Sequence, residues 1–186
     1  YTYAWDKSSS TLASAADLTA GVHTITITDA KGCQTTATVT ITEPAALAAS
    51  ALQDSPADCN GQANGAATVT VSGGNVPYTY AWDKSSSTLA SAADLAAGLH
   101  TITITDAKGC QTTATVTISE PSALSCNANQ DSPVTISGAA DGVASVVPSG
   151  GNGNFAYLWD NGETTATAVA LNAGSHSVTV TDSKGC

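Results

Sequence analysis

The chain has 186 residues with 15 acidic and 5 basic side chains, so its net charge of −10 argues against binding to nucleic acid or to an anionic membrane. A hydrophobic content of 42%, rich in β-branched residues, excludes a disordered segment. No apolar run approaches the ~18 residues that a membrane helix needs.

An internal repeat organises the whole chain. Residues 1–44 and 78–121 are nearly identical, and the three tryptophans, Trp5, Trp82 and Trp159, follow one another at intervals of 77 positions. Fixed periods of this kind mark tandem arrays. We therefore divide the chain into a partial first repeat (residues 1–44), a complete middle repeat (45–121) and a third repeat (122–186) that lacks its last strand. We expect the sequence to be part of a longer array.

Strand signals follow one another along the middle repeat. A weak first strand is expected at residues 46–53, and one or two short strands at 88–95. Clear alternation of apolar and polar residues predicts further strands at 66–72, 78–82, 101–105 and 113–118. Asp106–Gly109 has the composition of a tight hairpin turn. Six or seven short antiparallel strands are typical of an immunoglobulin-like sandwich, so the sequence predicts an all-β array of such modules.

All nine aromatic residues lie in one strand of each repeat and recur with period two, so each trio shares a face of its strand. The trios are Tyr1, Tyr3 and Trp5; Tyr78, Tyr80 and Trp82; and Phe155, Tyr157 and Trp159. One interpretation is an exposed platform for stacking sugars. We favour a core stripe, with Trp82 and Tyr80 nearly fully buried, because a 77-residue module has no other large aromatic to bury.

One histidine stands at the start of the next long strand in each repeat: His23, His100 and His176. In sandwiches this corner often holds a tyrosine that ties back to the backbone, and we expect the histidine to do the same. A catalytic or metal-binding role needs further ligands or partners close by. His23 and Cys33, the obvious nucleophilic pair, lie at opposite ends of one extended strand, so we expect no enzyme activity.

Five cysteines in an array of small-cored modules indicate disulfides. Cys33, Cys110 and Cys186 occupy the same last-hairpin turn of their repeats, whereas Cys59 and Cys126 come earlier in theirs. If the chain enters a repeat at one pole and leaves at the other, the last hairpin turn lies at the upstream pole and Cys59 near the downstream pole. This favours a Cys126–Cys186 pair within the third repeat and leaves Cys59 directed toward the next module. A Cys59–Cys110 pair within the middle repeat stays open.

No cofactor is expected, with structural Ca²⁺ as the alternative. Acidic residues recur near the junctions and turns at Asp17, Asp29, Glu43, Asp94, Asp106, Glu120 and Asp182. Ca²⁺ takes six to eight oxygen ligands, and no D-x-D-x-D-G run provides them here. A solvated acidic surface that limits self-association explains the same residues.

The strings Gly73–Trp82 (GGNVPYTYAW) and Leu95–Cys110 (LAAGLHTITITDAKGC), with Cys59-Asn-Gly upstream, closely resemble the SprB repeat. The pattern is also similar to PKD-type repeats, whose WDFGDG-like turn is absent. Two departures from the family stand out. The corner tyrosine is a histidine in all three repeats, and the third repeat has Phe155-Ala-Tyr157 and a displaced early cysteine, Cys126.

The resemblance implies a repeat of large cell-surface adhesins that are exported by the type IX secretion route and serve gliding motility. We therefore expect a stalk or spacer segment of an extracellular filament. Its partners would be neighbouring repeats of the same chain, with surface polysaccharide and the outer-membrane secretion and gliding machinery bound through other parts of the protein. The alternative is a carbohydrate-binding accessory array of a secreted hydrolase.

Overall fold

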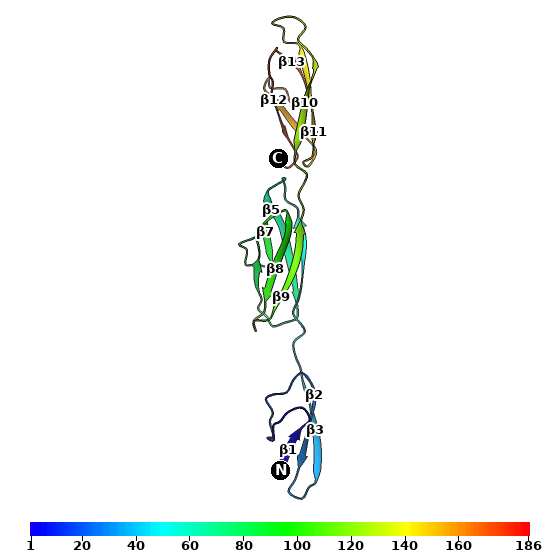
Figure 1. The fold of residues 1–186 in the computed structure, drawn as a ribbon, viewed down its shortest axis with the longest axis vertical. Coiled ribbons are helices and arrows are strands. Elements are labelled where there is room, and N and C mark those ends of the chain that lie inside the picture. Colours follow the sequence, from blue (N-terminus) through cyan, green and yellow to red (C-terminus); the bar gives the residue numbers. More distant parts are fainter. The chain divides into compact units, whose positions relative to one another are not determined.

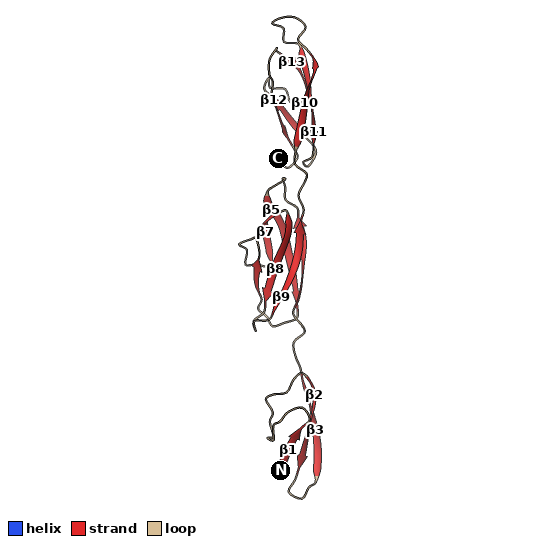
Figure 2. Cartoon of the chain, viewed as in Figure 1, coloured by secondary structure: helices blue, strands red, loops and turns tan.

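The computed structural model describes all 186 residues and contains fourteen strands and no helix (Figure 2). Accordingly, no helix is present that could cross a membrane. The chain divides into two compact units, Tyr1–Ala46 and Leu47–Cys186 (Figure 1). The boundaries of the three repeats themselves remain those that the 77-residue period predicts.

The first unit is a single antiparallel sheet in the order β1-β2-β3. Its strands are β1 (Thr2–Trp5), β2 (Gly21–Thr28) and β3 (Gln34–Ile41). Alternation places His23 and Ile25 of β2 on the buried face, whereas β3 is exposed along nearly its whole length. The sheet is half of a sandwich, and most of its second face is therefore open to water.

In the second unit, the middle repeat forms two antiparallel three-stranded sheets. One has the order β4-β5-β7, from β4 (Ala48–Ser55), β5 (Ala63–Ser72) and β7 (Ser91–Ala96). The other has the order β6-β8-β9, from β6 (Thr79–Trp82), β8 (Gly98–Thr105) and β9 (Gln111–Ile118). The two sheets enclose one hydrophobic core, and the predicted immunoglobulin-like sandwich is confirmed.

Strict alternation builds this core from few large residues. In β9, Ala114, Val116 and Ile118 are buried, while the threonines between them face water. Ile102 and Ile104 of β8 are completely buried beside them. Each buried aliphatic side chain contributes about 1.5–3 kcal/mol, so the sandwich is stable only if nearly all of its inward positions are apolar.

The third repeat follows the same plan with one strand fewer. Its sheets are β10-β11-β13 and β12-β14, from β10 (Ser125–Ser132), β11 (Gly142–Ser149), β12 (Ala156–Trp159), β13 (Thr167–Leu171) and β14 (Val178–Thr181). Its core is smaller and consists of Val146, Trp159, Ala168 and Leu171. No strand here takes the place of β9, and β10 is exposed along its length.

A cavity of about 480 Å³ lies in the third repeat and is lined in part by Gly142, Trp159 and Leu171. The corresponding glycine of the middle repeat, Gly65, leaves so little room that an added Cβ would lie 2.4 Å from Cγ2 of Ile118. The last residue of β9 therefore fills this place in the middle repeat. The cavity lies where the end of β9 packs in the middle repeat. Its shape is that of a missing strand and does not indicate a small-ligand site.

The aromatic trios take the core position only in part. Trp82 and Trp159 are 6% and 3% exposed, and their indole Nε1 atoms donate hydrogen bonds to backbone carbonyls. Tyr80 is only half-buried, so the prediction that it is nearly fully buried is wrong. Tyr80 packs against the core from β6, the edge strand of its sheet, and has a neighbouring strand on one side only. A tyrosine tolerates this because its hydroxyl is polar.

In the first unit the same trio is less covered. Trp5 and Tyr3 are half-buried, and Tyr1 is 85% exposed. Phe155 and Tyr157 of the third repeat are half-buried as well. Where both sheets of a repeat are present, the tryptophan is therefore the one member of each trio that is enclosed.

We expect Trp82→Ala to lower the free energy of unfolding by about 3–5 kcal/mol, because it removes the largest buried side chain and leaves a cavity. Denaturant unfolding followed by circular dichroism measures the change. The matched control is Leu52→Ala in β4, where the side chain is 71% exposed and the expected change is within about 0.5 kcal/mol. Equal effects of the two substitutions would contradict the core assignment.

Candidate functional site

The most elaborate polar arrangement in the chain lies where the middle repeat meets the third repeat. Its first component is the turn Asp58–Gly61 between β4 and β5. The turn is closed by a hydrogen bond from the amide of Gln62 to the carbonyl of Cys59 (3.1 Å), and Asn64 bonds Asp58 through both its amide oxygen and its amide nitrogen (2.9 Å each). Gly61 has φ +79°, a conformation that favours glycine.

This turn is tied to the segment through which the chain leaves the middle repeat. The amide of Gly61 donates to Oε2 of Glu120 (2.6 Å), and Nδ2 of Asn60 donates to the carbonyl of Pro121 (3.2 Å). The amide of Ala57 donates to the carbonyl of Ser119 (2.9 Å). The turn and the junction therefore form one ordered surface at the downstream pole of the middle repeat.

The second component is the last hairpin turn of the third repeat, Asp182–Cys186. Oδ1 of Asp182 accepts hydrogen bonds from the amides of Lys184 (2.9 Å) and Cys186 (3.0 Å). Oδ2 accepts two from Asn152, through its amide (2.7 Å) and its side chain (2.9 Å). With only 6% of Asp182 exposed, the carboxylate organises the turn from inside.

Burial by itself raises the pKa of Asp182. The hydrogen bonds from Asn152, Cys186 and Lys184 outweigh burial and lower the pKa to about 2. Asp106 in the middle repeat is held in the same way by Cys110, Asn75 and Lys108, and its pKa is also about 2. Both turns therefore depend on an ionised carboxylate.

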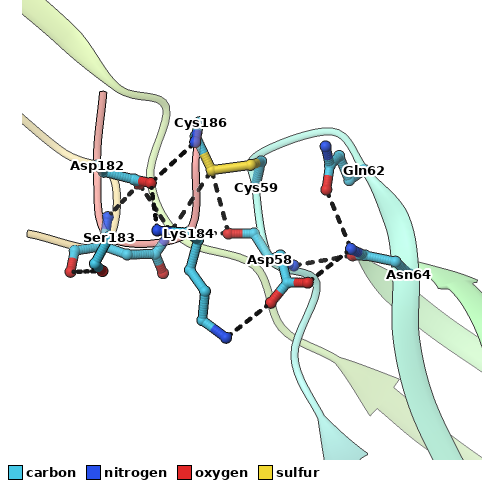
Figure 3. Close-up of polar contacts among 9 residues, drawn as sticks. Asp58, Cys59, Gln62, Asn64, Asp182, Ser183, Lys184 and Cys186 are labelled. Carbon is cyan, nitrogen blue, oxygen red and sulfur yellow. Dashed lines mark hydrogen bonds and ion pairs between the residues drawn. A yellow bond between two sulfur atoms is a disulfide. The ribbon is translucent and has the colours of Figure 1, made fainter. Parts of the chain in front are cut away.

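Three contacts join this side of the third repeat to the turn of the middle repeat, and Figure 3 shows the disulfide and the ion pair among them. Cys59 and Cys186 form a disulfide with a Cα–Cα distance of 5.7 Å. Nδ2 of Asn152 donates to the carbonyl of Asp58 (2.8 Å), and Nζ of Lys184 lies 3.0 Å from Oδ1 of Asp58. We call the turn Asp58–Gly61, the turn Asp182–Cys186 and Asn152 together the joint.

The joint corrects the predicted cysteine pairing. The pair Cys126–Cys186 is wrong, because Cys186 is bonded across the joint to Cys59 and Cys126 is a free thiol exposed on β10. The pair Cys59–Cys110 is wrong as well. Cys59 lies beside the end of β9, whereas Cys110 precedes its first residue, and eight strand residues span about 27 Å.

Cys33, Cys110 and Cys126 are free and exposed. The sequence predicts that the last hairpin turn and Cys59 lie at opposite poles of a repeat. The disulfide agrees with this prediction, because it joins Cys59 at the downstream pole of the middle repeat to the hairpin turn at the upstream pole of the third repeat. What sequence reasoning missed was the partner set around the disulfide. Asp58, Asn152 and Lys184 carried no motif that set them apart from other surface polar residues.

The disulfide closes a loop of 127 residues that contains most of both repeats. In the chain-entropy model, closing such a loop lowers the conformational entropy of the unfolded chain. This stabilises the folded state by about 5 kcal/mol. The exposed ion pair of Asp58 and Lys184 contributes at most ~1 kcal/mol and mainly sets orientation. The arrangement can therefore carry tension between repeats through a covalent bond.

The corner histidines form a separate set. Nε2 of His100 lies 2.8 Å from the carbonyl of Ala96, and the rings of His23 and His176 make the corresponding contact with Thr19 (2.7 Å) and Asn172 (2.9 Å). His23 and His100 are buried, and Nδ1 of each faces an aspartate at 3.5 Å. These contacts tie each histidine to the backbone four residues earlier.

His176 differs from the other two in its exposure. The hydrogen bond to Asn172 and the contact of Nδ1 with Asp160 (3.0 Å) raise the pKa of His176, and the same contact lowers that of Asp160. His23 lies near the start of β2, and Cys33 lies in the turn beyond its other end, so the two side chains form no nucleophile–base pair. No group of three or more His, Cys, Asp or Glu side chains is arranged to hold a metal ion.

The two hairpin aspartates predict acid sensitivity. Because their pKa of about 2 lies below the ordinary value of 3.8, they stabilise the fold fully above pH ~4, and this contribution is lost as the pH falls toward 2. We expect Asp106→Asn to reduce stability at pH 7 and to weaken the acid-induced loss between pH 4 and 2. Urea unfolding at several pH values measures both.

The matched control for this acid experiment is Glu43→Gln, which removes an exposed carboxylate that accepts no hydrogen bond. It should leave the pH profile of stability unchanged. A profile in which Asp106→Asn parallels the unchanged protein from pH 7 to 2 would contradict the assigned role of Asp106.

Comparison with known proteins gives one family. The model of the SprB repeat matches residues 53–87 and 128–164, which lie in the middle and third repeats. Each match contains the tryptophan of its repeat, and the first contains Cys59 and the rest of its turn. No curated protein matches the chain.

Among solved structures, the chain is similar to three N-terminal domains of the Highly Immunogenic Outer Capsid protein (Hoc) of bacteriophage RB49. The identity is 18% and the TM-score 0.41, with 72% of this chain and 54% of that chain covered. The chain thus spans about half the length of that solved structure. The matched segments, one in each repeat, identify the middle and third repeats as SprB repeats.

Proposed function

We propose that this segment is a stalk or spacer of a cell-surface adhesin, in which successive repeats are joined covalently so that the filament resists extension. The observation that carries the proposal is the Cys59–Cys186 disulfide between the middle and third repeats. A disulfide inside one repeat would stabilise that repeat, whereas one between repeats also fixes their connection. Resistance to tension is what a surface filament requires.

The force path through the joint supports this role. Tension that enters the middle repeat along the chain reaches Cys59 and passes directly to Cys186. The 127 residues of the loop carry none of it, even if their strands separate. Unfolding of either sandwich therefore adds little to the length of the segment while the disulfide is intact.

The disulfide and the acidic composition both support an extracellular location. A disulfide persists in an oxidising environment outside the cytosol. The SprB repeat family occurs in cell-surface proteins. A net charge of −10 on 186 residues keeps neighbouring filaments from associating. Export by the type IX route and service in gliding motility are part of the proposal and rest on the family.

Nothing in the two sandwich repeats favours the carbohydrate-binding alternative. A sugar platform needs exposed aromatic faces, and the tryptophans of the middle and third repeats are buried. Binding of surface polysaccharide and contact with the secretion and gliding machinery therefore belong, in this proposal, to other parts of the full protein. We also propose that the segment catalyses no reaction and needs no cofactor, including Ca²⁺.

Single-molecule pulling between the two ends of the chain tests the mechanical role. In the oxidised protein, unfolding should release only the residues before Cys59. Reduction should add the 127 shielded residues, or about 42–46 nm of contour length. Cys186→Ser should give the long contour without reductant.

Cys126→Ser is the matched control for this measurement, because Cys126 is a free thiol. It should behave like the unchanged protein in both conditions. Equal contour lengths before and after reduction would show that the joint does not bear load, and the stalk proposal would fail.

A further inference from the structure

The last hairpin turn of the middle repeat is a second copy of the turn that forms the joint. Asp106-Ala-Lys-Gly-Cys110 corresponds to Asp182-Ser-Lys-Gly-Cys186. Oδ1 of Asp106 accepts hydrogen bonds from the amides of Lys108 (2.8 Å) and Cys110 (2.9 Å), as Asp182 does in its own turn. The two turns therefore present the lysine and the cysteine from the same backbone scaffold.

The third member of the set is also present. Asn75 donates its amide (2.9 Å) and its side chain (3.1 Å) to Oδ2 of Asp106, in the way that Asn152 bonds Asp182. In the joint, the Asn152 side chain makes a further hydrogen bond to the carbonyl of Asp58. The Asn75 side chain has no such second acceptor.

Each of these groups is without a partner beyond its own repeat. Lys108 forms no ion pair, although its counterpart Lys184 binds Asp58. Cys110 is a free, exposed thiol, although its counterpart Cys186 is bonded to Cys59. The upstream pole of the middle repeat thus carries all three contact groups of the joint in their unoccupied form.

We propose that Asn75, Lys108 and Cys110 form an acceptor face for an Asp-Cys-Asn-Gly turn of a preceding repeat. The turn supplies a carbonyl for Asn75, a carboxylate for Lys108 and a thiol for Cys110. Its sequence is that of Asp58–Gly61, which makes these three contacts in the joint. The proposal rests on the geometry of the joint and does not depend on the stalk function.

The occupant must come from another repeat. Cys59 is already bonded to Cys186 and lies at the opposite pole from Cys110. Cys33 belongs to a hairpin turn of the acceptor type, and residues 1–44 contain no Asp-Cys-Asn-Gly sequence. A turn that resembles Asp58–Gly61 in sequence and backbone shape is therefore the partner that matches the face.

Bond formation follows ordinary thiol–disulfide exchange. The thiolate of Cys110 attacks a mixed disulfide on the incoming cysteine and expels the other thiol. The incoming cysteine is oxidised beforehand by a small disulfide such as oxidised glutathione, which is reduced to two thiols over the two steps. Two protons and two electrons leave the pair of cysteines, and both electrons are accepted by the reagent disulfide.

In an array with a disulfide at every joint, the loops that successive disulfides close would overlap. The Cys59–Cys186 loop spans 127 residues, which exceeds the repeat period of 77, so a staple at the next joint would begin inside the previous loop. The third repeat departs from this rule, because Ile136 stands where the period places a second Cys59. All three hairpin cysteines are present in this chain, whereas the two positions for the cysteine of the donor turn hold Cys59 and Ile136.

The first experiment uses the unchanged chain and a peptide of residues 57–62 whose cysteine carries 2-nitro-5-thiobenzoate. Reaction at each free thiol releases the coloured leaving group, and mass mapping assigns the site. Cys33 is the internal control, since its turn has the same Asp-Ala-Lys-Gly-Cys sequence but lacks the asparagine. We expect Cys110 to react roughly three to ten times faster than Cys33, because Lys31 offers the peptide the same ion pair as Lys108 and the hydrogen bond of Asn75 is the difference.

Changes to the acceptor face should reduce this preference. Lys108→Gln and Asn75→Ala should each lower the ratio of Cys110 to Cys33 labelling. A peptide with alanine in place of its aspartate should slow both reactions and leave the ratio unchanged. Equal labelling of the two cysteines with the original peptide would overturn the proposal.

The second experiment replaces residues 1–44 with another copy of residues 45–121, which places a complete repeat before the middle one. After equilibration with oxidised and reduced glutathione, alkylation and intact mass count the remaining thiols. Two disulfides and two thiols are expected, and Cys110→Ser should leave one disulfide and three thiols. If Cys59–Cys186 forms and four thiols remain, the acceptor face does not function.

Discussion

The joint depends on one interaction, the burial of an ionised aspartate inside a five-residue hairpin turn. Asp182 has little access to water and still remains charged, because four N–H groups point at its two oxygens. Hydrogen bonds to a charged group are stronger than those between neutral groups. They fix the backbone of Cys186 and the orientation of Asn152, and both of these then reach the neighbouring repeat.

The small size of each sandwich explains why such a device is useful. The middle repeat has ten buried hydrophobic residues in its core, and the third repeat has four. Domains of this size bury a modest fraction of their surface and are marginally stable by themselves. A covalent bond between repeats adds stability by restricting the unfolded chain, so it requires no further apolar residues. The sequence can then keep the threonine-rich faces that hold it in solution.

Much of this fold follows from the sequence, because alternation and repetition are local signals. The threonine alternation of residues 101–105 and 113–118 predicted β8 and β9, and Trp82 was correctly assigned to the core. The burial of Tyr80 could not be read in the same way. Period two shows which residues share a face, but it does not show that β6 lies at the edge of its sheet.

The cysteine pairing failed for a different reason. The chain direction placed Cys59 and the hairpin turns at opposite poles, and this much was correct. Choosing Cys126 for Cys186 assumed that pairs form within a repeat, whereas the upstream pole of the third repeat faces the downstream pole of the middle repeat. A disulfide between repeats joins cysteines of two neighbouring repeats, so the two partners cannot be found within one repeat.

The two turns of the joint differ in how freely their sequences can change. The acceptor half is part of the hairpin that closes β8 and β9, and its aspartate and glycine are needed for folding whether or not a partner is bound. The donor half lies in a connection between β4 and β5 that can change without loss of a strand. Where the donor cysteine is replaced, as at Ile136, one disulfide between repeats is lost and the sandwich remains intact. An array can therefore vary the number of its disulfide-linked joints while keeping its fold.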